Sequence, residues 1–379
     1  MDFSTLCVHG SGKRYDTTGS ISVPIFQSAT FAHPGVGQST GFDYTRVQNP
    51  TREYLESTIA ALEGGVDAIA FSSGMAALMA LMELFSPGER LIVSDDLYGG
   101  THRLFRSISS KNGLKYDFVD TSNPGAVEAA IAPETRAVFV ESPTNPMMQV
   151  TDLAEIARIC KANGLLLVVD NTFLTPYFQR PLVLGADIVL HSGTKYLGGH
   201  NDTLAGFLVA ADAGLAEKLR FVAKTIGACL SPFDSFLLLR GIKTLAVRLE
   251  RQEDSAKKIA SWLKGHKNVK KVYYPGLPDH PGHDILKRQA TGFGAMISFA
   301  VDSPTRARAV LENVKIIKYA ESLGGVESLI TYPMLQTHAD IPAEEREKKG
   351  INGCLLRLSV GIESPCDLIE DLRQALESN

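Results

Sequence analysis

Cysteine, tryptophan and long hydrophobic runs are all scarce in this chain. Its 379 residues include one tryptophan and five cysteines, and the cysteines are widely spaced: Cys7, Cys160, Cys229, Cys354 and Cys366. An odd number without close pairs argues against a disulfide framework and a cysteine zinc site, and we predict no metal. No apolar run approaches the roughly 18 residues of a membrane span, and the start resembles no secretion signal. These absences favour a cytoplasmic protein that is not embedded in a membrane.

Dense blocks of one charge sign are also missing. Lys and Arg number 38 against 42 Asp and Glu, so the formal net charge is −4. This balance argues against binding to nucleic acid or to an anionic membrane. The apolar fraction of 44% is that of a globular protein, and the length predicts two or three domains.

Three stretches differ in their pattern. Residues 1–60 show no sustained period and many turn formers, which predicts an N-terminal arm unable to bury itself alone. Residues 61–232 hold apolar runs that alternate with helical stretches, at 67–71, 90–94, 115–119, 137–141, 165–170, 186–192 and 205–210. Such runs predict a mostly parallel α/β sheet. Residues 233–379 predict a smaller α/β domain with one long helix and strands at 271–275, 295–301 and 355–362.

Polar side chains follow several of these strands. In an open parallel sheet, ligands bind beyond the carboxyl ends of the strands. Ser73, Gly74 and Met75 follow the first run and open a helix, whose free N–H groups and dipole favour a phosphate. A simple helix cap is the alternative at this position.

Two further strand ends carry groups that suggest catalysis. Asp170 ends a run of five apolar residues, and a buried acid there needs a cation unless it serves as a cap. Ser192, Thr194 and Lys195 lie in a glycine-rich turn after another strand. This turn predicts a nucleophilic amine beside a phosphate cradle, with a solvated lysine as the alternative.

Two more polar groups follow strands at the same edge. Tyr98 comes after residues 90–94, and Asn145 lies in the turn Ser142-Pro143-Thr144-Asn145-Pro146. Each has a structural alternative, in packing and in turn formation. Taken together, these residues offer a lysine for a Schiff base, an acid for a ring nitrogen, a stacking ring and a phosphate cup. Pyridoxal 5′-phosphate (PLP) is the cofactor that needs all four.

The order of the short motifs resembles a known family. The motifs are Tyr44-x-Arg46-x-x-Asn49-Pro50-Thr51, Ser73-Gly74-Met75, Asp170-Asn171-Thr172, Ser192-x-Thr194-Lys195, Ser322-Leu323-Gly324-Gly325 and Leu356-Arg357-Leu358-Ser359-Val360-Gly361. They resemble the Cys/Met-metabolism PLP enzymes, the transsulfuration family, over nearly the whole chain. The resemblance implies the aspartate-aminotransferase type of fold (PLP fold type I). It also implies a homotetramer built from two active dimers.

The resemblance also implies a role for each matching residue. Lys195 would carry the cofactor and move protons, Asp170 would keep the pyridine nitrogen protonated, and Tyr98 would stack on the ring. Other cofactor contacts would come from Gly74, Met75, Asn145, Thr172, Ser192 and Thr194, and from Tyr44 and Arg46 of a neighbouring subunit. Arg357 would bind the substrate carboxylate, with Ser322 beside it.

Two acids indicate which member of the family this chain resembles. Asp43 precedes Tyr44 and Glu321 precedes Ser322, as in cystathionine γ-synthases, where such acids suit the amine of cysteine or the distal ammonium of cystathionine. The sequence thus predicts γ-replacement of an O-acylhomoserine by cysteine. Cystathionine γ-lyase and β-lyase share most of these residues and are the alternatives, followed by O-acetylhomoserine sulfhydrylase.

Two other readings fit the sequence less well. The loop Tyr98-Gly99-Gly100-Thr101 lacks the cysteine expected of a methionine γ-lyase. Ser192-x-x-Lys195 also matches the signature of serine acyl-enzymes, but the companion motifs of that class are missing.

Overall fold

Seven strands form the sheet of the large domain, and each grows from one of the apolar runs. The computed structural model describes residues 1–12 and 16–378. The strands are β1 (Asp67–Phe71), β2 (Arg90–Ser94), β3 (Lys115–Val119), β4 (Thr135–Glu141), β5 (Leu166–Asp170), β6 (Ile188–Ser192) and β7 (Gly206–Ala210). Their order in the sheet is β1-β7-β6-β5-β4-β2-β3. Only β7 runs antiparallel to its neighbours among these strands, so the predicted mostly parallel sheet is confirmed.

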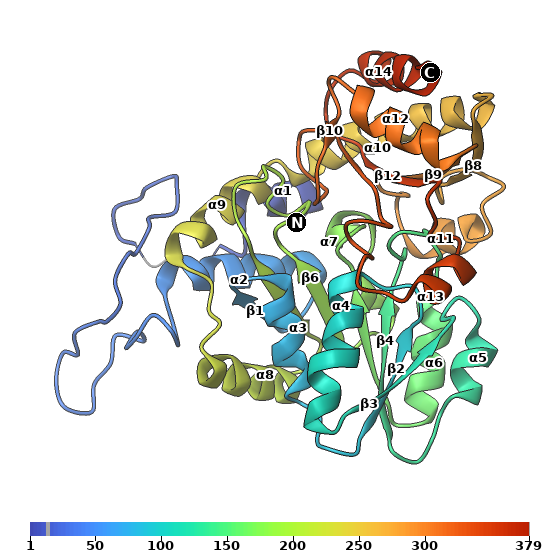
Figure 1. The fold of residues 1–379 in the computed structure, drawn as a ribbon. Helices are drawn as coiled ribbons and strands as arrows, with labels where there is room; N and C mark the ends of the chain where they lie inside the picture. Colours follow the sequence, from blue (N-terminus) through green and yellow to red (C-terminus); the bar gives the residue numbers. More distant parts are fainter. Residues whose placement is uncertain (13–15, 379) are drawn as a thin grey trace.

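Helices cover both faces of this sheet (Figure 1). Those before residue 230 are α1 (Phe3–His9), α2 (Pro50–Glu63), α3 (Gly74–Met82), α4 (Gly99–Arg103), α5 (Pro124–Ala129), α6 (Leu153–Ala162), α7 (Thr175–Phe178) and α8 (Ala213–Ile226). One apolar core lies between the sheet and α3 with α8, and another lies between the sheet and α6. Except for the edge strand β3, the strands are largely buried, because apolar side chains from both helix layers pack on them.

The small domain follows at the top of Figure 1. Its strands are β8 (Val269–Tyr273), β9 (Met296–Val301), β10 (Lys318–Tyr319), β11 (Leu329–Thr331) and β12 (Leu355–Ser359), in the order β10-β11-β12-β9-β8. Its helices, with those that lead into it, are α9 (Pro232–Ile242), α10 (Leu245–Gly265), α11 (His283–Gln289), α12 (Pro304–Asn313), α13 (Ala343–Lys348) and α14 (Pro365–Glu377). The predicted long helix is α10. Strands β10 and β11 were not predicted from the sequence. They have two and three residues, too few to show a periodic pattern of apolar side chains.

The described residues up to Glu63 form helices α1 and α2, with irregular chain between the two helices. α2 is capped by Asn49, whose side chain accepts from the backbone N–H of Thr51 at 3.0 Å, and it packs on β1 and α9. Between α1 and α2 the described chain projects away from the body, at the left of Figure 1. Residues 13–15 of the predicted arm lie outside the described residues. Domain boundaries near residues 60 and 232 stay a prediction.

Candidate active site

A cavity of about 230 Å³ lies at the carboxyl edge of the large sheet, where the small domain meets it. Twelve of the residues predicted from sequence line it together: Gly74, Met75, Tyr98, Asn145, Asp170, Thr172, Ser192, Thr194, Lys195, Glu321, Ser322 and Arg357. They come from the ends of β1, β2, β4, β5 and β6 and from the small domain. Parallel strands bring such ends to one edge, which is why residues far apart in sequence meet here.

Lys195 lies in the turn after β6 and reaches across to the small domain. Its Nζ donates a hydrogen bond to Ser322 Oγ at 2.9 Å. Burial and the neighbouring Arg357 cation lower the pKa of Lys195 to about 8, while Glu321 acts in the opposite direction. The low pKa expected for a catalytic lysine is therefore present, and near neutral pH a useful fraction of the amine is uncharged.

Asp170 ends β5 on the floor of the cavity. Its Oδ1 accepts from the Thr172 N–H at 3.0 Å and from Thr172 Oγ1 at 2.6 Å. Burial raises the pKa of this carboxyl, whereas the bonds from Thr172 and the charge of His191 lower it. A buried carboxylate in this position favours a cationic partner inside the cavity.

The start of α3 forms a cup with the end of β6. Ser73 caps the helix, its side chain accepting from the backbone N–H of Ala76 at 3.1 Å, and the first-turn N–H groups of Gly74 and Met75 have no intrahelical acceptor. A Cβ at Gly74 would lie 3.1 Å from Cβ of Ser192, so glycine allows the two turns to approach. The result is a polar concavity at a helix N-terminus, suited to a phosphate.

Arg357 is the largest cation enclosed by the cavity. It comes from β12 and is 1% exposed. Its guanidinium donates to Asn145 Oδ1 at 2.8 Å and to Ser322 O and Thr331 Oγ1 at 3.1 Å each. Within the described part of the chain Nε has no hydrogen-bond partner. Burial lowers the pKa of Arg357 to about 10, so the guanidinium stays charged and favours an anion.

This arrangement agrees with the comparison to known protein families. Residues 4–377 match the model of the family described as Cys/Met metabolism PLP-dependent enzyme. The chain belongs to the Cys/Met metabolism PLP-dependent enzymes. Its cofactor is PLP and its reaction is that of a transferase or lyase of transsulfuration. The serine acyl-enzyme alternative is thereby excluded.

Individual members of the family are similar over their full length. The chain is 51% identical to cystathionine γ-lyase of Bacillus subtilis over 378 residues, which cover 100% of both chains. It is also 51% identical to a cystathionine γ-synthase/O-acetylhomoserine (thiol)-lyase of the same organism, over 96% of this chain and 94% of the relative. The solved cystathionine γ-synthase of Xanthomonas oryzae in complex with cystathionine is 43% identical, with a TM-score of 0.97 over 99% and 98% of the chains. The fold of these family members is therefore the fold of this chain.

The residues of the cavity fit PLP by their donor set. The cup of α3 and Ser192 would hold the phosphate, Asp170 would face the ring nitrogen, and Lys195 supplies the primary amine that a pyridoxal aldehyde requires. Tyr98, whose side chain stands at the rim, is 40% exposed and free to cover a ring. When bound, PLP supplies a sink for the electrons left behind when an amino acid loses its Cα proton.

Three of the site residues predicted from the sequence lie outside the cavity: Asp43, Tyr44 and Arg46. Asp43 accepts from Ser39 Oγ at 2.8 Å and lies 3.5 Å from His33 Nε2. The Arg46 guanidinium lies over the Tyr44 ring, 5.6 Å from its centroid, and donates to the backbone oxygen of Lys224. Within one chain, the arm therefore does not reach the site.

Glu141 was missed by the sequence reasoning. It ends β4 and pairs in register with Asp170 of β5, and its Oε2 accepts from the Tyr98 N–H at 3.0 Å. Burial, and next the charge of Asp170, raise the pKa of Glu141 well above its usual range. Burial raises the pKa of Asp170 as well, but two hydrogen bonds from Thr172 oppose that rise, so Asp170 is the more readily ionised of the two carboxyls. An acid closing an apolar run was the signal that found Asp170, and it applies equally to Glu141.

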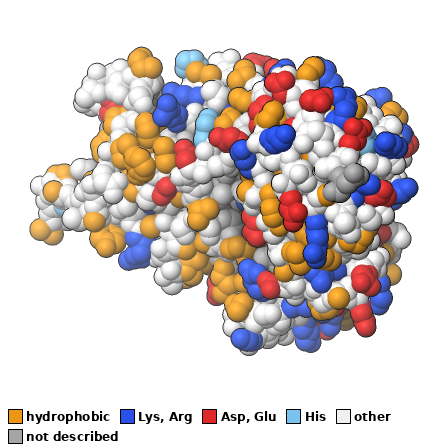
Figure 2. Space-filling view, turned by 45° about the horizontal axis from the view of Figure 1, so that its top comes forward, with side chains coloured by type: hydrophobic (Ala, Val, Ile, Leu, Met, Phe, Trp, Pro, Cys, Tyr) orange, Lys and Arg blue, Asp and Glu red, His pale blue; other side chains and the backbone are white. Residues whose placement is uncertain are grey.

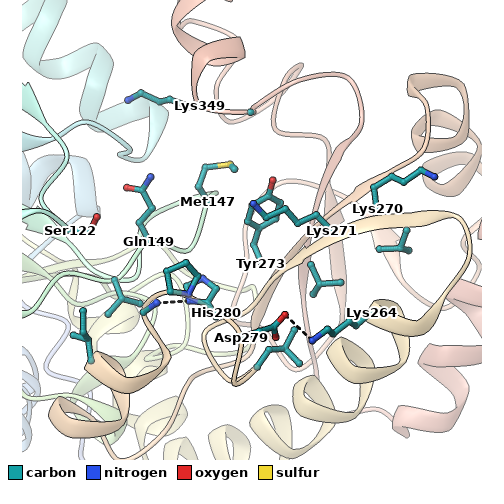
Figure 3. Close-up of a pocket in the computed structure, with 18 of the residues that line it drawn as sticks. Ser122, Met147, Gln149, Lys264, Lys270, Lys271, Tyr273, Asp279, His280 and Lys349 are labelled. Atoms are coloured by element: carbon teal, nitrogen blue, oxygen red, sulfur yellow. Dashed lines mark hydrogen bonds and ion pairs between the residues drawn. The ribbon is translucent and has the colours of Figure 1, made fainter.

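A second, larger cavity of about 870 Å³ lies between the small domain and the loop after Asn145 (Figure 3). Several lysines line it, and neighbouring groups contact some of those that Figure 3 labels. Lys264 pairs with Asp279 at 2.8 Å, and Lys271 lies over the Tyr273 ring at 4.7 Å. Figure 3 shows Lys270 pointing away from Met147 and Gln149. The labelled ammonium groups do not converge, so the smaller cavity is the one equipped for chemistry.

Proposed function

We propose that the protein is a cystathionine γ-synthase, which replaces the acyl group of an O-acylhomoserine by the sulfur of cysteine. The observation that carries this proposal is the position of Glu321, next to Ser322 at the edge of a cavity that also contains Arg357. The cavity therefore has a buried cation, Arg357, and an exposed anion, Glu321. A substrate with an α-carboxylate at one end and a second ammonium group at the other matches this pattern.

Each polar residue of the cavity has a separate role in the proposed reaction. Arg357 binds the α-carboxylate, and Asn145 holds the guanidinium in place at 2.8 Å. Lys195, once neutral, takes the Cα proton and then moves protons to and from the neighbouring carbons, and Ser322 orients its Nζ. Glu321 faces the incoming amine of cysteine. A lowered pKa of Lys195 lets the same group act as base and acid near neutral pH.

Cystathionine γ-lyase is the second candidate, favoured by the full-length relative of that name. A lyase would bind the same thioether and release 2-oxobutanoate from cystathionine alone. Lys195 and Arg357 would have the same roles in both candidates. The acid pair of Asp43 and Glu321, which resembles that of the γ-synthases, is the feature that favours the synthase.

Replacing Glu321 with glutamine tests the proposed ammonium contact. We expect the KM for cysteine to rise about tenfold, because the variant loses a charge-assisted contact. In the absence of cysteine, elimination from O-acylhomoserine should change less than threefold, since that substrate has no second ammonium group. Steady-state kinetics with both reactions measures this difference. An unchanged KM for cysteine, or equal loss in both reactions, would contradict the role of Glu321.

We also propose that a second copy of the chain completes the site with Tyr44 and Arg46. A cavity of about 810 Å³ adjoins the active site, shares Thr194, Glu321 and Ser322 with it, and leaves room for a further segment. Figure 2 shows hydrophobic side chains gathered on and beside the projecting segment. Exposed apolar residues of this kind favour an interface with another subunit; they include Ile21, Val36, Tyr44, Phe221 and Phe233. A homotetramer of two active dimers is consistent with this proposal.

Replacing Arg46 with alanine should weaken retention of PLP by about tenfold or more, because a cation facing the phosphate would be lost. The measurement is the loss of visible cofactor absorbance during dialysis, together with the oligomeric state from light scattering. Replacing Arg158 with alanine provides the control, because Arg158 is an exposed cation of α6 that pairs with Glu155 of the same helix at 2.7 Å. An active wild-type monomer that retains its cofactor would overturn the proposal of a shared site.

A further inference from the structure

A loop of the small domain, residues 332–342 between β11 and α13, contacts the large domain beside the active site. Thr337 lines the cavity, and the next residue, His338, is fully buried at 0% exposure. Neither the motifs nor the roles described above account for a buried histidine in this position. A buried imidazole must have its polar atoms satisfied, so its contacts show what it does.

The ring of His338 links three segments. Nε2 lies 3.1 Å from the backbone oxygen of Leu97 and 3.1 Å from that of Asn145. Two carbonyl acceptors require that Nε2 carry the proton, so Nδ1 is the acceptor for Thr337 Oγ1 at 2.8 Å. One N–H group is thereby shared between the turn that precedes Tyr98 and the turn that carries Asn145.

Close packing confirms that the loop sits directly on the Tyr98 turn. A Cβ at Gly99 would lie only 1.8 Å from the backbone oxygen of Thr337. A glycine is needed at position 99 for this approach. The small-domain loop therefore contacts the turn after β2 through backbone as well as through the His338 ring.

The charge state of the ring matches these contacts. Burial, and next the Arg357 cation, lower the pKa of His338 to about 4. The neutral ring donates at Nε2 without placing a second positive charge beside Arg357. Asn145, which His338 holds through its backbone, holds Arg357 through its side chain at 2.8 Å.

We propose that His338 is a positioning residue, which fixes the Asn145 turn and the Tyr98 turn relative to Arg357 so that the carboxylate clamp is formed before substrate arrives. The proposal rests on the role given above to Arg357. It applies to a synthase and to a lyase alike, because both bind an α-carboxylate. A clamp that is held in advance lowers the free energy needed to order it on binding.

The test compares His338→Phe and His338→Gln holoenzymes with wild type, using O-acetylhomoserine or cystathionine, whichever the wild type turns over. Phenylalanine keeps the ring but removes the donor, leaving two buried carbonyls without it. We expect the KM for the amino-acid substrate to rise about tenfold, with kcat changed less than threefold. Glutamine, which places an N–H near the position of Nε2, should return the KM to within about threefold of wild type.

His283→Phe is the matched control, because the Nδ1 of His283 bonds another backbone oxygen, that of Pro275, at 2.8 Å and away from the cavity. It should leave the KM unchanged. If His338→Phe yields no soluble holoenzyme, His338→Met takes its place. An unchanged KM in the donor-free variant, or a glutamine variant as impaired as phenylalanine, would overturn the proposal. Because each variant is compared with the wild type on a substrate already turned over, the choice between synthase and lyase does not affect the outcome.

Discussion

Replacing Lys195 with alanine is expected to lower kcat by at least about 10³-fold. The variant loses both the amine that carries the cofactor and the base that removes the Cα proton, and general-base catalysis alone is worth about 10²–10⁴-fold. Within the described lining of the cavity, Lys195 is the only primary amine. The measurement is steady-state product formation with cofactor in excess.

The Lys195→Arg variant tests, in the same experiment, whether a positive charge at position 195 is enough for activity. Arginine keeps the positive charge but does not become neutral at accessible pH, so it should be as inactive as alanine. Lys111→Ala, an exposed lysine outside the cavity, should be fully active and serves as the control. Normal turnover by a folded Lys195→Ala enzyme would refute the assignment of Lys195.

Replacing Arg357 with lysine is expected to lower kcat/KM for amino-acid substrates by about 100-fold, equivalent to about 2.7 kcal/mol. The guanidinium is 1% exposed and is held by Asn145, Ser322 and Thr331 in a fixed orientation. A lysine ammonium keeps the charge but cannot make the parallel pair of hydrogen bonds to a carboxylate. The loss should appear mainly as a higher KM.

Arg248→Lys is the matched control for Arg357→Lys. Arg248 is also buried, at 4% exposed, and donates to the backbone oxygens of Tyr196 and Gly241 at 2.8 and 2.9 Å. Its replacement should lower the melting temperature and leave the KM near that of wild type. If both variants raise the KM equally, the effect of Arg357 is on folding rather than on the carboxylate.

The sequence predicted the large sheet well, because the signals for its strands are local. Each apolar run became a strand of the mostly parallel sheet. The polar groups after β1, β5 and β6 met at one edge, since these three strands share their direction. Lys195 and Asp170 could be found in this way from residues a few positions apart. Because ligands of an open parallel sheet bind beyond the carboxyl ends of its strands, the residues that follow the strands were enough to locate the site.

Other features depend on contacts between distant segments. Helix α2 begins inside the predicted N-terminal arm, residues 1–60, and ends at Glu63. It forms where its apolar side packs on β1 and α9. His338 sits in an irregular loop without periodicity, and its contacts come from segments about 190 and 240 residues earlier in the chain. No local pattern marks such a residue. The contacts of the arm residues Tyr44 and Arg46 are equally hidden from local sequence patterns, because their proposed partners lie in another subunit.

The most direct test of the account is one reaction mixture that contains holoenzyme, O-acylhomoserine and carbon-labelled cysteine. Mass spectrometry would follow the initial rates of labelled cystathionine and of 2-oxobutanoate together. We predict that labelled cystathionine forms first and at least about tenfold faster than 2-oxobutanoate, and that cystathionine supplied alone is consumed slowly. Rapid release of 2-oxobutanoate or pyruvate from cystathionine, without formation of the labelled thioether, would contradict a synthase.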